Sequence, residues 1–137
     1  MFLTQSLSRI RIWFQGSAME FETKVKKAIK AIPRGKVATY AQIASLAGNY
    51  KAARQVARVL HASSDKDRLP WHRVINSRGG ISLPRGRGFE EQKRLLKREG
   101  VAAGRSGRIA LKEFQWEPAP APSRAAREFV RRLTGED

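Results

Sequence analysis

The segment that begins at Thr39 constrains the fold of this chain more than any other. Thr39 and Gln42 have the spacing of a capping box, in which each side chain bonds the other residue's backbone amide, so a helix should begin there. Gly48 suits the left-handed conformation that commonly ends a helix, and Asn49 is a suitable N-cap for a next helix over roughly 50–62. Two helices joined by a short turn that contains glycine form a helix-turn-helix pattern.

The second of these helices has two chemically different faces. One face is apolar and would pack against the rest of the domain, while the other carries cations at helical spacing. A helix with one apolar face and one basic face suits a DNA groove, although a basic face exposed to solvent produces the same pattern. The apolar positions are Ala52, Val56, Val59 and Leu60, and the basic positions are Lys51, Arg54 and Arg58.

The charge of the chain favours nucleic acid as the partner. The 137 residues carry a net charge of +16 with an isoelectric point near 11.4, and such a balance indicates a polyanion. Residues 20–116 hold 22 Lys and Arg residues against 8 Asp and Glu residues, so the cations belong to the folded part. An anionic membrane surface is the weaker alternative, because no strongly amphipathic basic helix stands alone.

The absence of cysteine excludes several classes of site. A chain without cysteine has no disulfide, no cysteine-based zinc site and no thiol nucleophile. No stretch approaches the roughly 18–20 apolar residues of a membrane span. Arg9 and Arg11 interrupt the start that a secretory signal would need. We therefore expect a cytoplasmic monomer that uses no metal or other cofactor and contacts no membrane.

The remaining pattern predicts a mainly α, winged helix-turn-helix-like DNA-binding domain with a few short strands. Apolar residues at helical spacing predict helices over 21–32 and 89–99, and a wing-like loop rich in glycine and arginine covers 77–88. Val74–Ile75 predicts a short strand, and the alternation over 108–116 predicts a strand or edge segment.

Three sections follow one another along the chain. Residues 1–18 form an N-terminal extension that we expect to be poorly ordered, since Met19 directly precedes the first well-patterned helix. Residues 19–116 form the DNA-binding domain. Residues 117–137 form a proline-rich linker and a tail, in which 124–133 has the pattern of a short helix.

The most specific motif is Pro70-Trp71-His72-Arg73-Val74. With three further blocks in the same order, it resembles the C-terminal domain of the O6-alkylguanine-DNA alkyltransferases, whose active-site signature is Pro-Cys-His-Arg-Val. Trp71 stands where that family has its nucleophilic cysteine, which is typical of its alkyltransferase-like branch. The resemblance runs from about Phe21 to Glu99 and more weakly to Trp116, so we expect the DNA-binding half of the family alone. The other blocks are Ile32–Val37 with Thr39–Tyr40, Leu46–Asn49 with Lys51–Val56, and Leu95–Leu96 with Glu99–Val101.

The resemblance implies how a duplex would be engaged. Members of the family bind the minor groove and rotate the damaged nucleotide out of the base stack into a pocket. Arg54 would take its place, bond the orphaned cytosine and offset part of the cost of unstacking. Tyr40 would crowd the phosphate on the 3′ side of the lesion, and two small alanines would permit close approach to the groove. The predicted DNA-binding set is Tyr40, Lys51, Ala52, Ala53, Arg54 and Arg58.

The resemblance also implies a lesion pocket without an acceptor. The Trp71 indole would lie against the purine and its alkyl group, a contact that contributes about 1–3 kcal/mol when stacked. The indole has no electron pair that could take the alkyl group. The backbone carbonyls of Trp71 and Val74 would bind the edge of the flipped guanine. Arg85 or Arg87 would reach the alkyl group or a phosphate, although a solvated basic loop has the same composition. The predicted pocket is Tyr40, Trp71, Val74 and Arg85.

Three residues are predicted to support this pocket. His72 and Glu99 occupy the positions that activate the cysteine in the active family, and here they would shape the pocket. Arg73 would brace the motif from inside the fold by tying it to nearby backbone.

The sequence therefore predicts a non-enzymatic sensor. It would bind O6-alkylguanine in duplex DNA by nucleotide flipping, bend the duplex and flag the site for nucleotide-excision repair proteins, a partnership implied by the resemblance alone. The alternative is a winged helix-turn-helix transcription regulator that binds undamaged DNA, which explains the charge but not the tryptophan motif. A third class is an enzyme, either a glycosylase or an alkyltransferase using another side chain, for which His72 and Glu99 offer acid–base groups but no acceptor.

Overall fold

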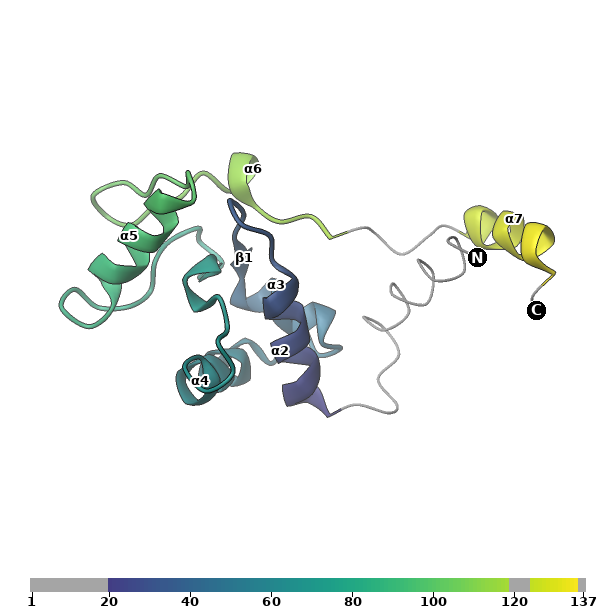
Figure 1. Cartoon of the computed structure of the whole chain (residues 1–137), viewed down its shortest axis with the longest axis horizontal. Helices are drawn as coiled ribbons and strands as arrows, with labels where there is room; N and C mark the ends of the chain where they lie inside the picture. Colours follow the sequence, from purple (N-terminus) through teal and green to yellow (C-terminus); the bar gives the residue numbers. More distant parts are fainter. Residues whose placement is uncertain (1–19, 119–123, 136–137) are drawn as a thin grey trace.

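The structure is a computed structural model that describes residues 20–118 and 124–135 (Figure 1). The predicted extension over 1–18 lies outside the described residues. The described residues form mostly helices and only short strands, which confirms the predicted mainly α class. In chain order the elements are α2 (Phe21–Ala31), β1 (Ala38–Thr39), α3 (Tyr40–Leu46), α4 (Ala53–Ser63), the 3-10 turn η1 (Trp71–Arg73), β2 (Val74–Ile75), α5 (Phe89–Arg98), α6 (Leu111–Phe114) and α7 (Arg124–Thr134).

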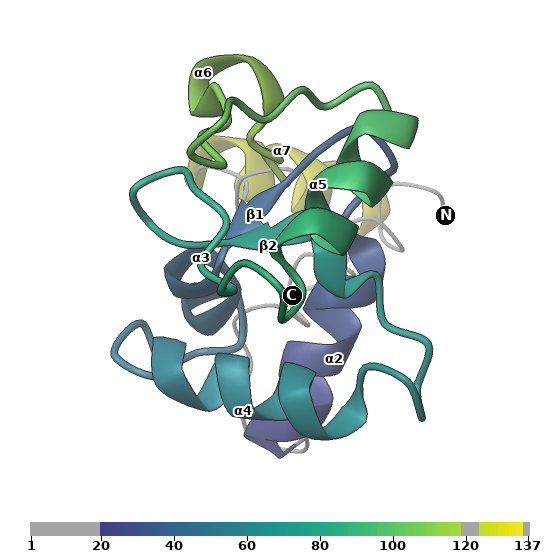
Figure 2. The ribbon, with the colours of Figure 1, turned by 90° about the vertical axis from the view of Figure 1, so that its left-hand side faces the viewer.

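A short parallel strand pair divides the interior of the main body, by which we mean residues 20–118, into two apolar clusters. β1 pairs with β2 in the register Ala38↔Val74 and Thr39↔Ile75. Because side chains alternate along a strand, Val74 belongs to one cluster and Ile75 to the other. The first cluster joins α2, α3 and α4, and the second joins α5 to the loops on either side of it. Figure 2 shows the strands between these two halves.

The first helix of the helix-turn-helix forms as predicted. The Gln42 N–H donates to the Thr39 hydroxyl at 3.0 Å, and the Thr39 N–H donates to the Gln42 side-chain oxygen at 3.4 Å, which completes the capping box. Gly48 adopts a φ of +98°, the left-handed conformation expected beyond a helix end. α3 is therefore bounded by the residues that the sequence indicated.

The second helix starts later than predicted. α4 begins at Ala53 rather than near residue 50, because the Asn49 side chain accepts the Lys51 N–H and so closes a turn before the helix. Lys51 consequently lies outside α4 and outside the helical stripe that its spacing predicted. The apolar side of the helix is confirmed, since Val56 and Leu60 are buried in the first cluster and Val59 packs against it.

The predicted strand over 108–116 is wrong for most of its length. Only two isolated bridges occur, Gly80↔Arg108 and Val37↔Gln115, and the helical turn α6 lies between them. The Ala110 carbonyl accepts the N–H groups of both Glu113 and Phe114 at 3.0 Å. Packing of α6 side chains on the second cluster favours this turn over an extended segment.

The tail confirms the helical pattern expected over 124–133. α7 carries Phe129 and Leu133, which are 62% and 60% exposed. Within the described residues, no helix is both long and apolar enough to cross a membrane.

Candidate nucleic-acid interface

A cavity of about 600 Å³ opens between α4, η1 and the loop that precedes α5. This volume lies within the range of roughly 300–1,000 Å³ that is typical of small-molecule sites. Tyr40 lines it from the start of α3, Trp71 from η1 and Arg87 from the loop. The remaining lining residues are Ala57, Leu60, His61, Ala62, Ser64, Asp65, Ser82, Leu83 and Gln92.

Trp71 is held in the cavity wall by its own backbone turn. Its N–H donates to the Leu69 carbonyl at 2.8 Å, and the Arg73 N–H donates to the Pro70 carbonyl at 3.0 Å. The half-buried indole packs against the first cluster, and the His72 ring meets it edge-on, with centroids 6.2 Å apart. The indole is therefore fixed between the core and the open space.

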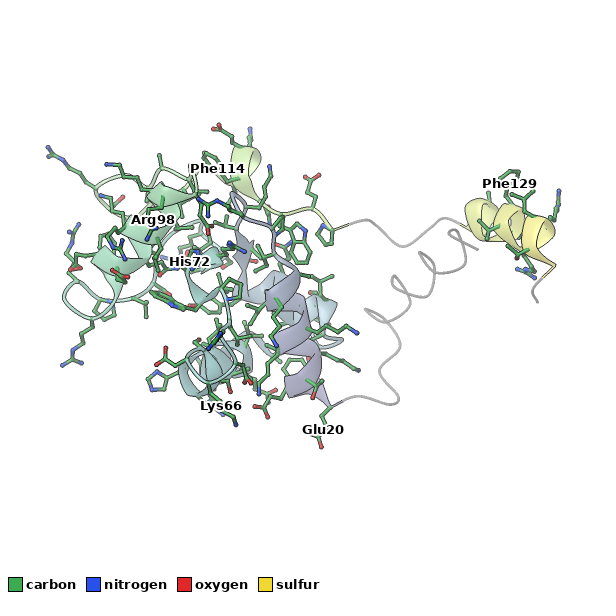
Figure 3. All side chains as sticks on the ribbon, in the orientation of Figure 1. Glu20, Lys66, His72, Arg98, Phe114 and Phe129 are labelled. Atoms are coloured by element: carbon green, nitrogen blue, oxygen red, sulfur yellow. The ribbon has the colours of Figure 1, made fainter. Side chains whose placement is uncertain are left out.

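Behind Trp71, one carboxylate organises the motif. Glu99, at the end of α5, accepts both Arg73 Nε (2.9 Å) and Arg73 Nη2 (2.7 Å), and His72 Nε2 lies 3.0 Å from the same carboxylate. Arg73 Nη1 also donates to the Ile32 carbonyl at 2.8 Å, which links the motif to the end of α2. Figure 3 shows His72 in the middle of the main body, between the α4 and α5 regions.

The electrostatics of this group follow from its bonds. The Glu99 side chain is only 7% exposed, and a buried carboxylate without partners would be destabilised in its charged form. The hydrogen bonds from Arg73 outweigh that burial and, with His72, lower the pKa of Glu99 from 4.5 to about 2. Glu99 is therefore ionised at neutral pH and has both oxygens engaged.

Gln92 is a supporting residue whose role the sequence prediction missed. Its buried side chain on α5 donates from Nε2 to the His72 carbonyl at 3.1 Å and to the Val74 carbonyl at 3.0 Å. A signal was present, because a glutamine within the buried stripe of an amphipathic helix needs polar partners. Which carbonyls it reaches depends on how α5 docks on β2.

Replacing Gln92 with leucine is expected to lower the free energy of unfolding by about 2 kcal/mol. The two carbonyls would lose their donor while staying buried, and each unsatisfied group of this kind costs about 1–3 kcal/mol. Urea unfolding at pH 7 measures the change. Lys97→Leu, at an exposed position of the same helix, should stay within about 0.5 kcal/mol of the wild type. An equal loss in both variants would contradict the role assigned to Gln92.

The predicted arginines of α4 lie next to the cavity. Arg54 and Arg58 are both exposed. Ala57 and His61 line the cavity and stand three and seven residues after Arg54, so helical spacing puts them on the same side of α4. The exposed basic side of the helix therefore continues into the cavity wall.

Three residues of the predicted site are buried or lie outside the cavity lining. Ala52 is 6% exposed and packs in the first cluster, which leaves Ala53 as the small residue nearer the surface. Val74 is buried by its pairing with Ala38, and it does not line the cavity. Arg85 does not line it either, because its guanidinium lies over the Phe89 ring and donates to a neighbouring loop. Arg87, the alternative to Arg85 in the sequence analysis, lines the cavity.

The turn before α4 exposes a residue that the sequence prediction passed over. Tyr50 is 70% exposed, and the Lys51 ammonium lies 5.7 Å from the centre of its ring. The available signal was an aromatic residue in a polar turn that directly precedes a basic helix.

Known proteins are similar to this chain in sequence and in fold. Residues 20–101 match the family model described as the DNA-binding domain of 6-O-methylguanine DNA methyltransferase. A DNA base-flipping protein of Vibrio parahaemolyticus is 42% identical over 99 residues, which make up 72% of this chain and 98% of that protein. Alkyltransferase-like protein 1 of Schizosaccharomyces pombe is 41% identical over 104 residues, with 72% of this chain and 96% of that protein covered.

The fold agrees with the sequence match. The crystal structure of the S. pombe protein in complex with damaged DNA containing O6-carboxymethylguanine matches with a TM-score of 0.67 at 41% identity, over 74% of this chain and 100% of that chain. The family match extends from α2 to the end of α5 and contains every residue that lines the cavity. The chain therefore belongs to the family defined by the DNA-binding domain of 6-O-methylguanine DNA methyltransferase.

Proposed function

We propose that this protein is a non-catalytic sensor that binds O6-alkylguanine in duplex DNA by rotating the damaged nucleotide into the Trp71 cavity. One observation carries the proposal: the cavity is large enough for a small molecule and adjoins the basic side of α4, and its wall holds an indole. The relatives named for base flipping, and the matched complex with damaged DNA, support the same function.

The lining suits an alkylated purine. Leu60, Leu83 and the Trp71 indole supply apolar surface, which favours a flat base and a hydrocarbon substituent. Ser82 and Arg87 supply donors on the loop side. A base that enters this space would therefore exchange the stacking of the duplex for contact with the indole.

Trp71, which stands where the family has its nucleophilic cysteine, cannot accept an alkyl group. The indole side chain of Trp71 offers no nucleophilic electron pair, and the chain has no cysteine to supply a thiolate. Glu99 is an unsuitable substitute, because both of its oxygens are occupied by Arg73 and His72. The protein therefore binds the lesion and leaves it chemically unchanged.

Tyr40 and Arg54 would open the duplex. Tyr40 stands at the cavity with its hydroxyl 3.4 Å from Ser82 Oγ, where it would press on the backbone of the rotated nucleotide. Arg54 projects from the first turn of α4 and would fill the vacated position in the base stack. Lys51, Ala53 and Arg58 would hold the neighbouring groove and phosphates.

The direct test is binding to two matched duplexes at about 150 mM salt, one with a single O6-methylguanine and one with guanine. The wild type should bind the lesion at least about tenfold more tightly, a difference of about 1.4 kcal/mol. Trp71→Ala should reduce that ratio and leave binding to the unmodified duplex unchanged, because stacking on the indole acts only on the flipped base. Equal binding by the wild type would exclude the sensor and favour the transcription regulator.

We further infer that the bound lesion is passed to nucleotide-excision repair, since binding alone leaves the alkyl group in place. In a reconstituted incision reaction, the protein should accelerate incision beside O6-methylguanine, and Trp71→Ala should not. A cytoplasmic location accompanies this proposal. It is supported by the cysteine-free composition, and cell fractionation would check it.

A further inference from the structure

Two loops beside the cavity gather an unusual concentration of arginine. The loop 77–88 and the loop 102–110 contain five arginines between them and no acidic residue. Arg87 lines the cavity, and the other four form what we call the wing arginines, all of them exposed. The wing arginines are Arg78, Arg85, Arg105 and Arg108.

Backbone bonds hold these loops together as one unit. The Ile81 N–H donates to the Gly107 carbonyl at 3.0 Å, and the Ile109 N–H donates to the Gly79 carbonyl at 2.8 Å. Gly107 has a φ of +82°, and a Cβ there would come within 2.7 Å of the Phe89 ring, so the close approach requires glycine. The cations are therefore held in position by the loops that carry them.

Two of the wing arginines donate from their guanidinium groups to backbone carbonyls. Arg85 Nη2 donates to the Arg105 carbonyl at 2.6 Å, and Arg108 Nη1 donates to the Arg78 carbonyl at 3.3 Å. Across the described ranges, no ion pair involves any wing arginine. Glu90, at the start of α5, forms no ion pair with a wing arginine, and its carboxylate accepts the Gly86 N–H.

Clustered cations without counter-charges repel one another in the free protein, and a polyanion relieves that repulsion. The cluster is continuous with the cavity rim, because Arg85 lies two residues before the lining residue Arg87 and bonds the loop that carries Arg105. A duplex that places a nucleotide in the cavity must run its backbone along this rim. On such a path, the phosphates would pass near the wing arginines.

We propose that the wing arginines form a second phosphate-binding surface, which grips the duplex backbone beyond the contacts made by α4. The proposal rests on the proposed function, since the cavity fixes where the duplex lies. Such a surface adds affinity without reading sequence or damage, because phosphate contacts are the same for every base. It would hold the duplex while the nucleotide is exchanged between stack and cavity.

The test is a salt titration of the full chain on both duplexes, with and without O6-methylguanine, comparing the wild type with Arg105→Gln/Arg108→Gln. The plot of log K against log salt has a negative slope, and each lost phosphate contact makes it shallower by about 0.9. The magnitude of the slope should therefore decrease by about 1–2 in this variant. Affinity for both duplexes should fall at least about threefold at 150 mM salt, while their ratio stays constant. Arg105→Lys/Arg108→Lys should restore the slope.

A matched control removes the same charge from another surface. Arg94→Gln/Lys97→Gln changes two exposed residues on the outward side of α5, where Arg94 is already paired with Glu91 at 2.6 Å. This variant should keep the slope of the wild type. An unchanged slope in Arg105→Gln/Arg108→Gln, or an equal fall in the control, would overturn the second surface. A wild type without lesion preference would instead overturn the proposed function. The salt slopes on the unmodified duplex would still show whether the wing arginines contact phosphates.

Discussion

Replacing Arg54 with alanine is expected to remove most of the preference for an O6-methylguanine duplex and to leave the protein folded. Arg54 is exposed in the first turn of α4, so its removal opens no cavity in the core. Without the guanidinium, the flipped state would leave a gap in the base stack and a cytosine without a partner. A loss of about 2–3 kcal/mol, or roughly 30- to 150-fold in lesion affinity, follows from that cost.

Binding of the two matched duplexes measures this effect, and Arg58→Ala is the control. Arg58 is exposed one turn further along α4, where we expect a phosphate contact alone. Its loss should weaken both duplexes about equally, and the ratio between them should stay constant. Arg54→Lys should not restore the preference, because an ammonium lacks the planar fork that bonds a base edge and stacks. An unchanged ratio in Arg54→Ala would show that another residue occupies the vacated position.

Glu99→Gln is expected to lower the free energy of unfolding by about 3 kcal/mol at pH 7, more than Gln92→Leu. The Arg73 guanidinium is 17% exposed and depends on the Glu99 carboxylate for its charge partner. Removing one member of a buried ion pair typically costs about 3–5 kcal/mol, because the remaining charge stays buried. Urea unfolding at pH 7 measures the change, and Glu113→Gln at an exposed carboxylate should be nearly silent.

The same substitution should alter how stability depends on pH. Because folding lowers the pKa of Glu99 from 4.5 to about 2, its contribution is fully present above about pH 4.5. The contribution is lost as the pH falls through the window from about 4.5 to 2, where the folded protein resists protonation and the unfolded chain does not. The wild type and Glu99→Gln should therefore differ most at pH 7 and converge toward pH 2. A difference that stays constant over this window would contradict the ion-pair account.

Several features of the site could be predicted because they depend on neighbours in the sequence. The capping box of Thr39 and Gln42 spans one helical turn, and its geometry is set within that turn. The buried positions of α4 follow from helical spacing alone, and Val56 and Leu60 lie where that spacing puts them. The Trp71 motif indicated a cavity because its residue order resembles a known family, and the structure places Trp71 in a cavity wall.

Other features depended on which of several possible contacts a residue makes, and the spacing of residue types along the sequence does not determine that choice. The Asn49 side chain could cap the helix or close a turn before it, and it closes the turn by accepting the Lys51 N–H. The pattern over 108–116 predicted a strand, yet residues 111–114 form a helical turn because Leu111 and Phe114 pack on the second apolar cluster. Arg85 and Arg87 are two residues apart in one loop, and the Phe89 ring and the Arg105 carbonyl hold Arg85 away from the cavity.

The amino-acid sequence by itself determined most of the helical elements, the basic charge and the absence of a thiol acceptor, since each is a property of composition or of residues within a turn of one another. Only the tertiary structure decided which side chains meet. Glu99 reaches Arg73 and His72 across 26 and 27 positions, and Gln92 reaches the Val74 carbonyl across 18. These contacts form because α5 docks against η1 and, through the second apolar cluster, against β2, and that packing is a property of the whole domain.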